Sequence, residues 1–446
     1  MASINGGASF KVSRKSPELI RAAKPTPHEL RILSDIDDQD GLRFQMPLAL
    51  IYRYSPSMEG RDPVRVIRDA VAKALVFYYP FAGRLREVAT RKLVVECTGE
   101  GVLFIEADAD ATLQQLGTLL PPIQNLHELL YDVPGSAGVI DCPLMLIQVT
   151  RLLCGGFVFA WRYNHTMADG AGIHQFIKAV CELARGAERP SVIPVWERHI
   201  LCARYPPRET MRHPEHDIVV DTKRTTIAHD RVVRHFFFGP TEISTLRQSL
   251  PPHLQSCTKF QIVTACMWRC RTIATFSDPN EVFRVLCVMN IREQMNPPLP
   301  QGYYGNAIVY PAAVATAEML LKNPLHYAVE LVRKAIQGAT EEFVKSVVDL
   351  MVLRGRPNLT GVQTYLVSSA RVFEVDVGWG QPAYGGVARA GVDSFPRAVS
   401  YFMRIKNSNG EDGIMVPICL PPKAMDVLVD ELQKMLPGRS SIASAL

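Results

Sequence analysis

The 446-residue sequence lacks several features that mark particular classes of protein. No stretch reaches the roughly 18 apolar residues that a membrane-spanning helix needs, and residues 1–15 contain no apolar segment of signal-peptide length. The ten cysteines form no CxxC pair. Because they lie mostly in apolar runs, we expect them to be reduced, buried side chains. These absences predict a soluble, intracellular protein with no membrane span.

The sequence also lacks a basic tail, a basic stripe and any repeat or low-complexity block. Its 49 basic and 44 acidic residues give a net charge of +5, and they are interspersed along the chain. Nucleic acid is therefore not expected as a partner. The composition, 47% hydrophobic and 21% charged, is that of a globular protein with a sizeable core.

The length favours two domains of roughly 200 residues each, with a substrate cleft between them. Prolines and charges crowd together between residues 190 and 230, including Arg204-Tyr205-Pro206-Pro207-Arg208. Proline removes backbone donors and disfavours helix before it, so this stretch is typical of an exposed crossover. We predict an N-terminal domain over 1–205, a linker over 206–230 and a C-terminal domain over 231–446.

Helical and β-prone patterns alternate along both halves of the chain. Apolar spacing predicts a helix over 62–77, and two β-prone runs, 93–96 and 102–106, flank a turn and predict a hairpin. The second half predicts further strands and helices, in order 235–238 (strand), 259–273 (helix), 283–290 (strand), 325–349 (largely helix), 374–379 (strand) and 414–420 (strand). This interleaving predicts an α/β fold in both halves.

The segment 156–165 is rich in aromatic and β-favouring residues and leads into a helix predicted over 173–183. His165 is therefore expected at the end of a strand, on the same face as Tyr163. A histidine with a near-neutral pKa is the usual side chain for taking a proton from a hydroxyl. The alternative is a hydrogen-bonded core histidine, since an HxxxD spacing also arises by chance.

Two motifs together resemble the signatures of a known family. Residues 165–170 read HTMADG and residues 376–380 read DVGWG, which resemble the HxxxDG and DFGWG signatures of the plant BAHD acyltransferases in their usual order and interval. The blocks FYYPFAGRL (77–85), GYYGN (302–306) and VPICLPP (416–422) extend the resemblance over essentially the whole chain. The stretches CTGEGVLFIEADAD, MNIREQMNPPLPQGYYGNA and GQPAYGG look most like the branch of alcohol acyltransferases that contains benzyl alcohol benzoyltransferases.

The resemblance implies two similar-sized mixed-sheet α/β domains of chloramphenicol-acetyltransferase type, with a channel between them and His165 at its middle. It implies a ternary complex in which His165 takes the alcohol proton and returns it to the departing coenzyme A thiolate. Acyl-CoA would be a cosubstrate, with no permanently bound cofactor or metal. Benzoyl-CoA and benzyl alcohol are the expected pair, the alternative being acetyl-CoA with an alcohol such as hexenol. A monomer is the implied oligomeric state.

Roles for residues around His165 follow from the same resemblance. The Trp379 indole N–H is a candidate donor to the oxyanion of the transition state. Asp169 is expected to turn away and pair with Arg292 in a structural role, and Gly170 to permit a close approach of the backbone.

The second motif is expected to shape a loop that stabilises the channel and the coenzyme site. Its residues Asp376, Gly378 and Gly380 match the family motif, whereas Val377 replaces the usual phenylalanine. Losing an aromatic ring leaves volume that neighbouring side chains must fill.

Binding residues are predicted on weaker grounds. Thr258 and Lys259 precede a predicted helix, where backbone N–H groups and a cation favour phosphate oxygens of coenzyme A; the alternative is a helix cap beside a solvated lysine. Tyr52, Phe159 and Tyr304 are candidates for the substrate pockets, the alternative being ordinary core aromatics.

The stretch 367–370 stands where relatives acting on acidic alcohols carry an arginine, which favours a small neutral alcohol, although Arg371 lies nearby. Two alternatives to an acyltransferase remain: a relative that has lost catalysis and acts as an interaction partner, and a metallohydrolase in which His165, Asp169 and His174 bind zinc. The sequence lacks the HExxH pattern that would favour the second.

The chain ends in Ser444-Ala445-Leu446, which resembles a degenerate peroxisomal signal. We therefore expect a peroxisomal location, with the cytoplasm as the alternative.

Overall fold

The computed structural model describes residues 10–217, 231–361, 363–370, 372–389, 399–407 and 409–436. It divides into two compact units, here called unit 1 (Met1–Ala203, Pro297–Ala307 and Val372–Arg389) and unit 2 (Arg204–Asn296, Ile308–Arg371 and Ala390–Leu446). This division differs from the contiguous domains expected from the sequence. Two later segments, one of them carrying DVGWG, belong to unit 1, and the expected linker opens unit 2, with its residues 218–230 outside the described part.

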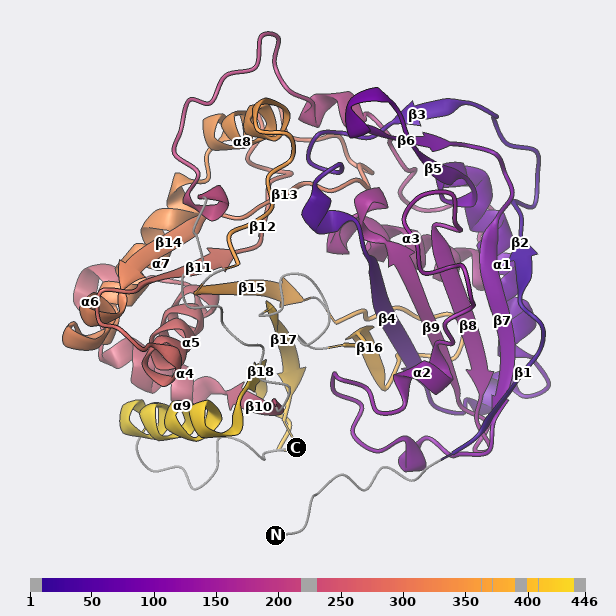
Figure 1. The fold of residues 1–446 in the computed structure, drawn as a ribbon. Helices are drawn as coiled ribbons and strands as arrows, with labels where there is room; N and C mark the ends of the chain where they lie inside the picture. Colours follow the sequence, from indigo (N-terminus) through magenta and orange to yellow (C-terminus); the bar gives the residue numbers. More distant parts are fainter. Residues whose placement is uncertain are drawn as a thin grey trace. The chain divides into compact units, whose positions relative to one another are not determined.

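Unit 1 is built on a seven-stranded mixed sheet in the order β1-β7-β8-β9-β4-β16, with β2 also paired to β7 (Figure 1). Its strands are β1 (Val12–Arg14), β2 (Glu18–Ile20), β4 (Gln45–Tyr52), β7 (Val102–Ala109), β8 (Met145–Arg151), β9 (Phe157–Asn164) and β16 (Tyr384–Val387). Strands β7 and β8 are parallel, and the other neighbours are antiparallel. The central strands β8, β9 and β4 are buried along most of their length, as expected for strands covered on both faces.

Two helices of unit 1, α1 (Pro63–Phe77) and α3 (Gly170–Ala184), pack against each other. A short helix, α2 (Leu126–Leu129), lies against β8. The Asp62 side chain accepts from Val64 N at the start of α1, which satisfies one of the free donors of a helix end. The helices predicted over 62–77 and 173–183 are therefore confirmed.

A separate three-stranded sheet in the order β3-β6-β5 combines β3 (Leu30–Ile32), β6 (Leu93–Glu96) and β5 (Arg84–Glu87). The predicted hairpin between 93–96 and 102–106 is wrong, although both strands exist. The turn residues bond elsewhere: Cys97 N donates to Glu29 O and Gly101 N donates to Ala82 O. These contacts lead the chain out of the small sheet and into β7 of the large one.

Unit 2 contains a six-stranded sheet in the order β10-β18-β17-β15-β11-β14. Its strands are β10 (Val232–Phe238), β11 (Val282–Cys287), β14 (Ala312–Thr316), β15 (Thr364–Ala370), β17 (Val399–Lys406) and β18 (Asp412–Leu420), and β12 (Met289–Asn290) pairs separately with β13 (Ile308–Val309). The helices are α4 (Pro240–Gln248), α5 (Lys259–Thr275), α6 (Ala317–Lys322), α7 (Leu325–Gly338), α8 (Glu341–Leu353) and α9 (Pro422–Met435). Both units therefore show the predicted mixed α/β architecture.

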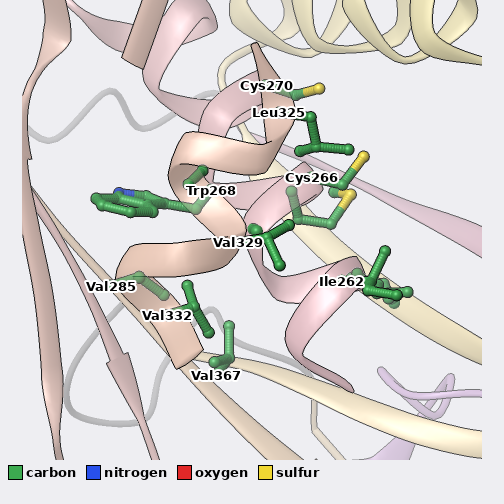
Figure 2. Close-up of a cluster of buried hydrophobic side chains, with 14 of the residues drawn as sticks. Ile262, Cys266, Trp268, Cys270, Val285, Leu325, Val329, Val332 and Val367 are labelled. Carbon is green, nitrogen blue, oxygen red and sulfur yellow. The ribbon is translucent and has the colours of Figure 1, made fainter. Parts of the chain in front are cut away.

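The core of unit 2 forms where α5 packs against α7 and α9. Figure 2 shows Ile262, Cys266 and Trp268 of α5 among Val329 of α7 and Val367 of β15. The helix predicted over 259–273 is thus confirmed, and the one predicted over 325–349 is divided between α7 and α8.

The strand predicted over 374–379 is wrong, because these residues form an irregular loop. Gly378 and Gly380 have φ angles of +118° and +82°, a region that strands do not use.

In the described part of the chain no helix is long and apolar enough to cross a membrane. All ten cysteines are free, and most are buried as predicted, but Cys154 is exposed.

Candidate active site

His165 lies where β9 ends and a short 3-10 turn, His165–Met167, leads into α3. The Asn164 side chain shapes this turn by accepting hydrogen bonds from Thr166 N at 3.2 Å and from Thr166 Oγ1 at 2.7 Å. His165 N donates to Phe44 O at 2.9 Å. The main chain at His165 is therefore fixed on both sides, at the strand end where the sequence predicted it.

The His165 ring packs between the rings of Phe44 and Tyr163, with centroids 5.2 and 5.8 Å away. The residue is partly exposed, whereas its Nδ1 atom is buried without a hydrogen-bond partner among the described residues. Burial lowers the pKa of His165 below its ordinary value of 6.5, against the opposing negative charge of Asp169. The imidazole is thus neutral at pH 7 and able to accept a proton.

Asp169 is buried and accepts three backbone hydrogen bonds. Its Oδ1 caps α3 by accepting from Ala171 N at 3.0 Å and Gly172 N at 2.9 Å, and its Oδ2 accepts from Ala307 N at 2.9 Å. These contacts suit a structural carboxylate. Arg292 belongs to unit 2, where its guanidinium donates to Asn290 Oδ1 at 3.1 Å, and its pairing with Asp169 stays a prediction.

The close backbone approach predicted at Gly170 is wrong and occurs instead at Gly172. Gly170 is exposed, and a Cβ atom built there meets no described atom within 4 Å. A Cβ atom at Gly172 would lie 1.9 Å from Tyr304 O. The first turn of α3 therefore touches the segment 302–306, the GYYGN block, and only glycine fits at the contact.

A buried polar cluster lies behind the His165 main chain. Asn306 Nδ2 donates to His165 O at 2.8 Å and to Asp37 Oδ1 at 2.9 Å. Asp37 in turn pairs with Arg198 at 2.7 Å, and both side chains are buried. Sequence reasoning missed Asp37 and Arg198 and gave Asn306 no role. The only available signal was the GYYGN block, which contains Asn306 but gave no indication that Asn306 contacts Asp37 and His165.

The DVGWG loop is held inside unit 1 by hydrogen bonds to its backbone. Asp376 Oδ1 accepts from Gly378 N at 2.6 Å and Gly380 N at 2.8 Å. The Arg185 guanidinium, at the end of α3, donates to Asp376 O. Val377 is fully buried, so neighbouring side chains enclose the residue that replaces phenylalanine.

The structure does not bring Trp379 and His165 together. The Trp379 ring packs edge-on against the Phe157 ring at 5.2 Å, and Phe157 begins the strand that ends just before His165. At a rise of about 3.3 Å per residue, the two ends of this segment lie about 25 Å apart. The predicted role of Trp379 as an oxyanion donor is therefore wrong.

Two of the three predicted pocket aromatics also lie away from His165. Tyr52 pairs in register with Phe157, and its hydroxyl donates to Val375 O at 2.7 Å, so this side chain anchors the DVGWG loop. Phe159 is fully buried within β9 and packs against Trp161 at 5.1 Å. Both are core side chains, which is the alternative that the sequence left open.

Tyr304, the third pocket candidate, lies in the segment that contacts α3. Its buried ring packs against Tyr78 at 5.1 Å and Phe81 at 5.9 Å, and burial raises the pKa of its phenol. Tyr304 is two residues from Asn306, whose side chain donates to His165 O. Of the three predicted pocket aromatics, it is the one near His165. Its contact with a substrate stays a prediction.

The residues predicted for coenzyme A lie in unit 2. The Thr258 side chain caps α5, accepting from Gln261 N at 3.2 Å, while Thr258 N donates to Gln261 Oε1 at 2.8 Å. Lys259 is exposed. Thr258 is thus a helix cap, and the phosphate contacts of both residues stay a prediction.

The zinc alternative finds no ligand set in the described ranges, which hold no group of three or more histidine, cysteine, aspartate or glutamate side chains spaced for a metal ion. His174 stacks on Phe373 at 5.0 Å, and the carboxylate of Asp169 accepts from backbone N–H groups. The Asp169 carboxylate therefore already has other partners.

Comparison with known proteins identifies the family. The model of the Transferase family matches residues 10–435. The chain is 58% identical to benzyl alcohol O-benzoyltransferase of Petunia hybrida over 97% of this chain and 95% of that protein. It is 51% identical to (Z)-3-hexen-1-ol acetyltransferase of Arabidopsis thaliana, with 96% of each chain covered.

Solved structures share the fold. Vinorine synthase matches with a TM-score of 0.73 at 22% identity, covering 95% of this chain and 98% of that one. The F. graminearum TRI101 complex with coenzyme A and T-2 mycotoxin matches with a TM-score of 0.68 at 16% identity, covering 89% and 96%. With the two sheet-rich units and the family match, these similarities show that the chain belongs to the BAHD acyltransferases of the Transferase family and is an acyl-CoA-dependent O-acyltransferase.

Proposed function

We propose that this enzyme transfers the benzoyl group of benzoyl-CoA to benzyl alcohol, giving benzyl benzoate and free coenzyme A, with His165 as the general base. The observation that carries the proposal is a neutral, partly exposed His165 on a fixed main chain. The 58% identity to a benzyl alcohol O-benzoyltransferase over 97% of the chain supports the choice of substrates.

In this reaction the neutral His165 ring takes the hydroxyl proton as the alcohol oxygen attacks the thioester carbonyl carbon. The new C–O bond forms first, the C–S bond then breaks, and the proton passes from the imidazolium to the departing thiolate. Because Nδ1 is buried, Nε2 is the nitrogen that faces the substrates. No side chain becomes acylated, so both substrates are bound together when the acyl group moves.

A second candidate is acetyl transfer to a short aliphatic alcohol. The specific observation in its favour is the 51% identity to a (Z)-3-hexen-1-ol acetyltransferase over 96% of the chain. Both candidates use a small neutral acceptor. That choice is supported by Val367 to Ala370, which contribute no charge to the end of β15; Arg371 lies outside the described residues.

The test compares product formation by purified enzyme from benzoyl-CoA with benzyl alcohol and from acetyl-CoA with (Z)-3-hexen-1-ol, by gas chromatography. Benzyl benzoate as the faster product supports the first proposal, and hexenyl acetate as the faster product replaces it with the second. Coenzyme A release is followed with a thiol reagent over a panel of acyl donors and alcohols. No release by folded protein with any pair would favour a non-catalytic relative.

We also propose a peroxisomal monomer. The terminal Ser444-Ala445-Leu446 lies outside the described residues, so the targeting proposal depends on the sequence alone. A fluorescent fusion that stays in peroxisomes after deletion of these three residues, or that never enters them, contradicts it. Light scattering of the eluting peak tests the monomer.

A further inference from the structure

The amide of Asn306 joins the His165 main chain to a buried ion pair. Its Nδ2 donates to His165 O at 2.8 Å and to Asp37 Oδ1 at 2.9 Å, and Asn306 N donates to the same carboxylate oxygen at 2.8 Å. The Asn306 side chain is fully buried. The orientation of its amide is thus defined by the two hydrogen bonds that Nδ2 donates, which is the usual way of assigning an amide.

The anchor of Asn306 is itself rigid. Arg198 Nη1 lies 2.7 Å from both oxygens of Asp37, and Arg198 Nη2 donates to Met167 O at 2.9 Å. Ser34 Oγ and Ser34 N also donate to Asp37 Oδ2, at 2.7 and 3.0 Å. Because a charge left unpaired in the interior is costly, this pair stays closed in the folded protein.

Two buried atoms near this junction have no hydrogen-bond partner among the described residues: Asn306 Oδ1 and His165 Nδ1. One is an acceptor, and the other can carry a proton. They belong to residues already joined by a 2.8 Å hydrogen bond. Hydrogen bonds of catalytic groups are often loose before substrate binds and tighten in the complex.

We propose that Asn306, fixed by the Asp37–Arg198 pair, is a positioning residue for His165: its Nδ2 holds the His165 carbonyl, and its Oδ1 accepts the proton on His165 Nδ1. This fixes the tautomer in which Nε2 carries the free lone pair. The proposal deepens the role of His165 as general base and rests on that proposed function. It also gives a role to the GYYGN block, which contributed to the family resemblance but had no assigned function.

The charges around His165 support the same arrangement. The Asn306 side chain, the carboxylates of Asp169 and Asp37 and the carbonyl of His165 itself each raise the pKa of His165 against the larger lowering by burial. Removing the Asn306 amide takes away one of these contributions. The pKa of His165 then falls further, and both tautomers become populated.

The kinetic test compares Asn306→Ala with Gln148→Ala. Gln148 is a matched control, because it is a buried amide of unit 1 that donates to Glu128 O at 2.8 Å and pairs with Ala160 of β9, about 16 Å along the strand from His165. We expect kcat of Asn306→Ala to fall by about 10- to 100-fold with little change in KM for the acyl-CoA, since a small misplacement of a catalytic group has such an effect. The same loss in Gln148→Ala, or a wild-type kcat in Asn306→Ala, would overturn the proposal.

A spectroscopic test separates this proposal from the proposed function, because it needs no turnover. Nitrogen-15 NMR of histidine-labelled protein, with the His165 signals assigned from His165→Ala, reports both the tautomer and the pKa. We expect a proton on Nδ1 in the wild type and a lower pKa with mixed tautomers in Asn306→Ala, and no change in Gln148→Ala. A wild-type ring protonated on Nε2 at neutral pH would exclude the proposed contact even if the enzyme esterifies alcohols as expected.

The buried pair is tested with Arg198→Lys, because Arg198→Met leaves Asp37 charged and unpaired and is expected to unfold the protein. Lysine keeps the positive charge but cannot reproduce the simultaneous contacts of the guanidinium with Asp37 and Met167 O. We expect folded Arg198→Lys to show an intermediate loss of kcat and an intermediate His165 pKa. A folded Arg198→Lys variant that matches the wild type in both measurements would show that Arg198 does not help to position His165.

Discussion

His165 of unit 1 and His213 of unit 2 are both histidines within hydrogen-bonded clusters. Around His213 the residue types resemble a nucleophile, a base and an acid: Nε2 lies 2.8 Å from Ser346 Oγ, and Nδ1 lies 2.9 Å from Glu215 Oε1. All three side chains are buried. Ser346 Oγ also accepts from the backbone N–H groups of Thr210 and Met211, each at 3.0 Å, so its own proton is left for His213.

His165 differs from His213 in the hydrogen-bonding capacity that its ring has left for a substrate. Both ring nitrogens of His213 have hydrogen-bond partners and Ser346 is buried, whereas His165 is partly exposed and its Nδ1 has no hydrogen-bond partner among the described residues. The cluster at His213 fastens residues 210–216 to α8. A serine, a histidine and an acid at hydrogen-bond distance therefore do not define a catalytic site unless the ring retains bonding capacity and access.

The largest expected difference between the two histidines is in the effect of an alanine substitution on catalysis. His165→Ala is expected to lower kcat/KM by about 100- to 10,000-fold, because the general base is lost. His213→Ala is expected to keep the kcat of the wild type per folded molecule. Steady-state kinetics of both variants, with circular dichroism to count folded protein, provides the measurement; activity that survives in the first variant would overturn the mechanism.

The second prediction concerns stability at His213. His213→Ala leaves Glu215 and Ser346 without their partner in the interior and is expected to lower the free energy of unfolding by about 1–3 kcal/mol. His253→Ala is the control, because this side chain is 59% exposed, and its effect should stay within about 0.5 kcal/mol. Urea unfolding followed by fluorescence measures both, and equal effects would show that the buried cluster adds nothing.

The third prediction tests how rigidly the His165 turn is held. Gly172→Ala places a Cβ atom 1.9 Å from Tyr304 O. Because the Cβ is fixed to the helix and Tyr304 O belongs to the backbone, neither atom can rotate away, and we expect a loss of about 1–3 kcal/mol in stability, together with a lower kcat. Gly170→Ala meets open space at an exposed position and is not expected to destabilise the protein. If the two alanine variants unfold at the same urea concentration, the close contact between α3 and residues 302–306 is not rigid.

The smallest expected effect is in the pH dependence. His165 accepts a proton only when neutral, and burial lowers its pKa from 6.5, so kcat/KM should be level near pH 7 and fall by about tenfold per unit on the acid side of a pKa below about 6.5. An acid limb with its midpoint above pH 7 would contradict a base whose pKa is lowered.

Stability must be followed in the same experiment. Burial also lowers the pKa of His216, so the unfolded chain binds more protons than the folded one below the ordinary histidine pKa, and stability falls as the pH decreases through that range. Circular dichroism at each pH separates unfolding from titration of His165.

Local patterns in the sequence determined a good deal of this structure. The aromatic strand 157–164 and the glycine-rich step after it placed His165 at a strand end, because alternation and helix periodicity act over neighbouring residues. The same reasoning gave α1, α3 and α5 with small errors at their ends. It failed at 374–379, where the Asp376 side chain and two left-handed glycines replace the strand with a loop.

The tertiary structure decided which of these pieces meet. It placed Trp379 and Tyr52 at the start of β9 rather than beside His165, and it brought Asn306 onto Asp37 across 269 residues of sequence and Arg198 onto Asp37 across 161. Such contacts depend on strand register and on the burial of charge, and a buried charge requires a partner wherever in the chain that partner lies. The sequence by itself therefore determined the position of His165 and its local frame, whereas the packing of distant segments selected the groups that contact its main chain.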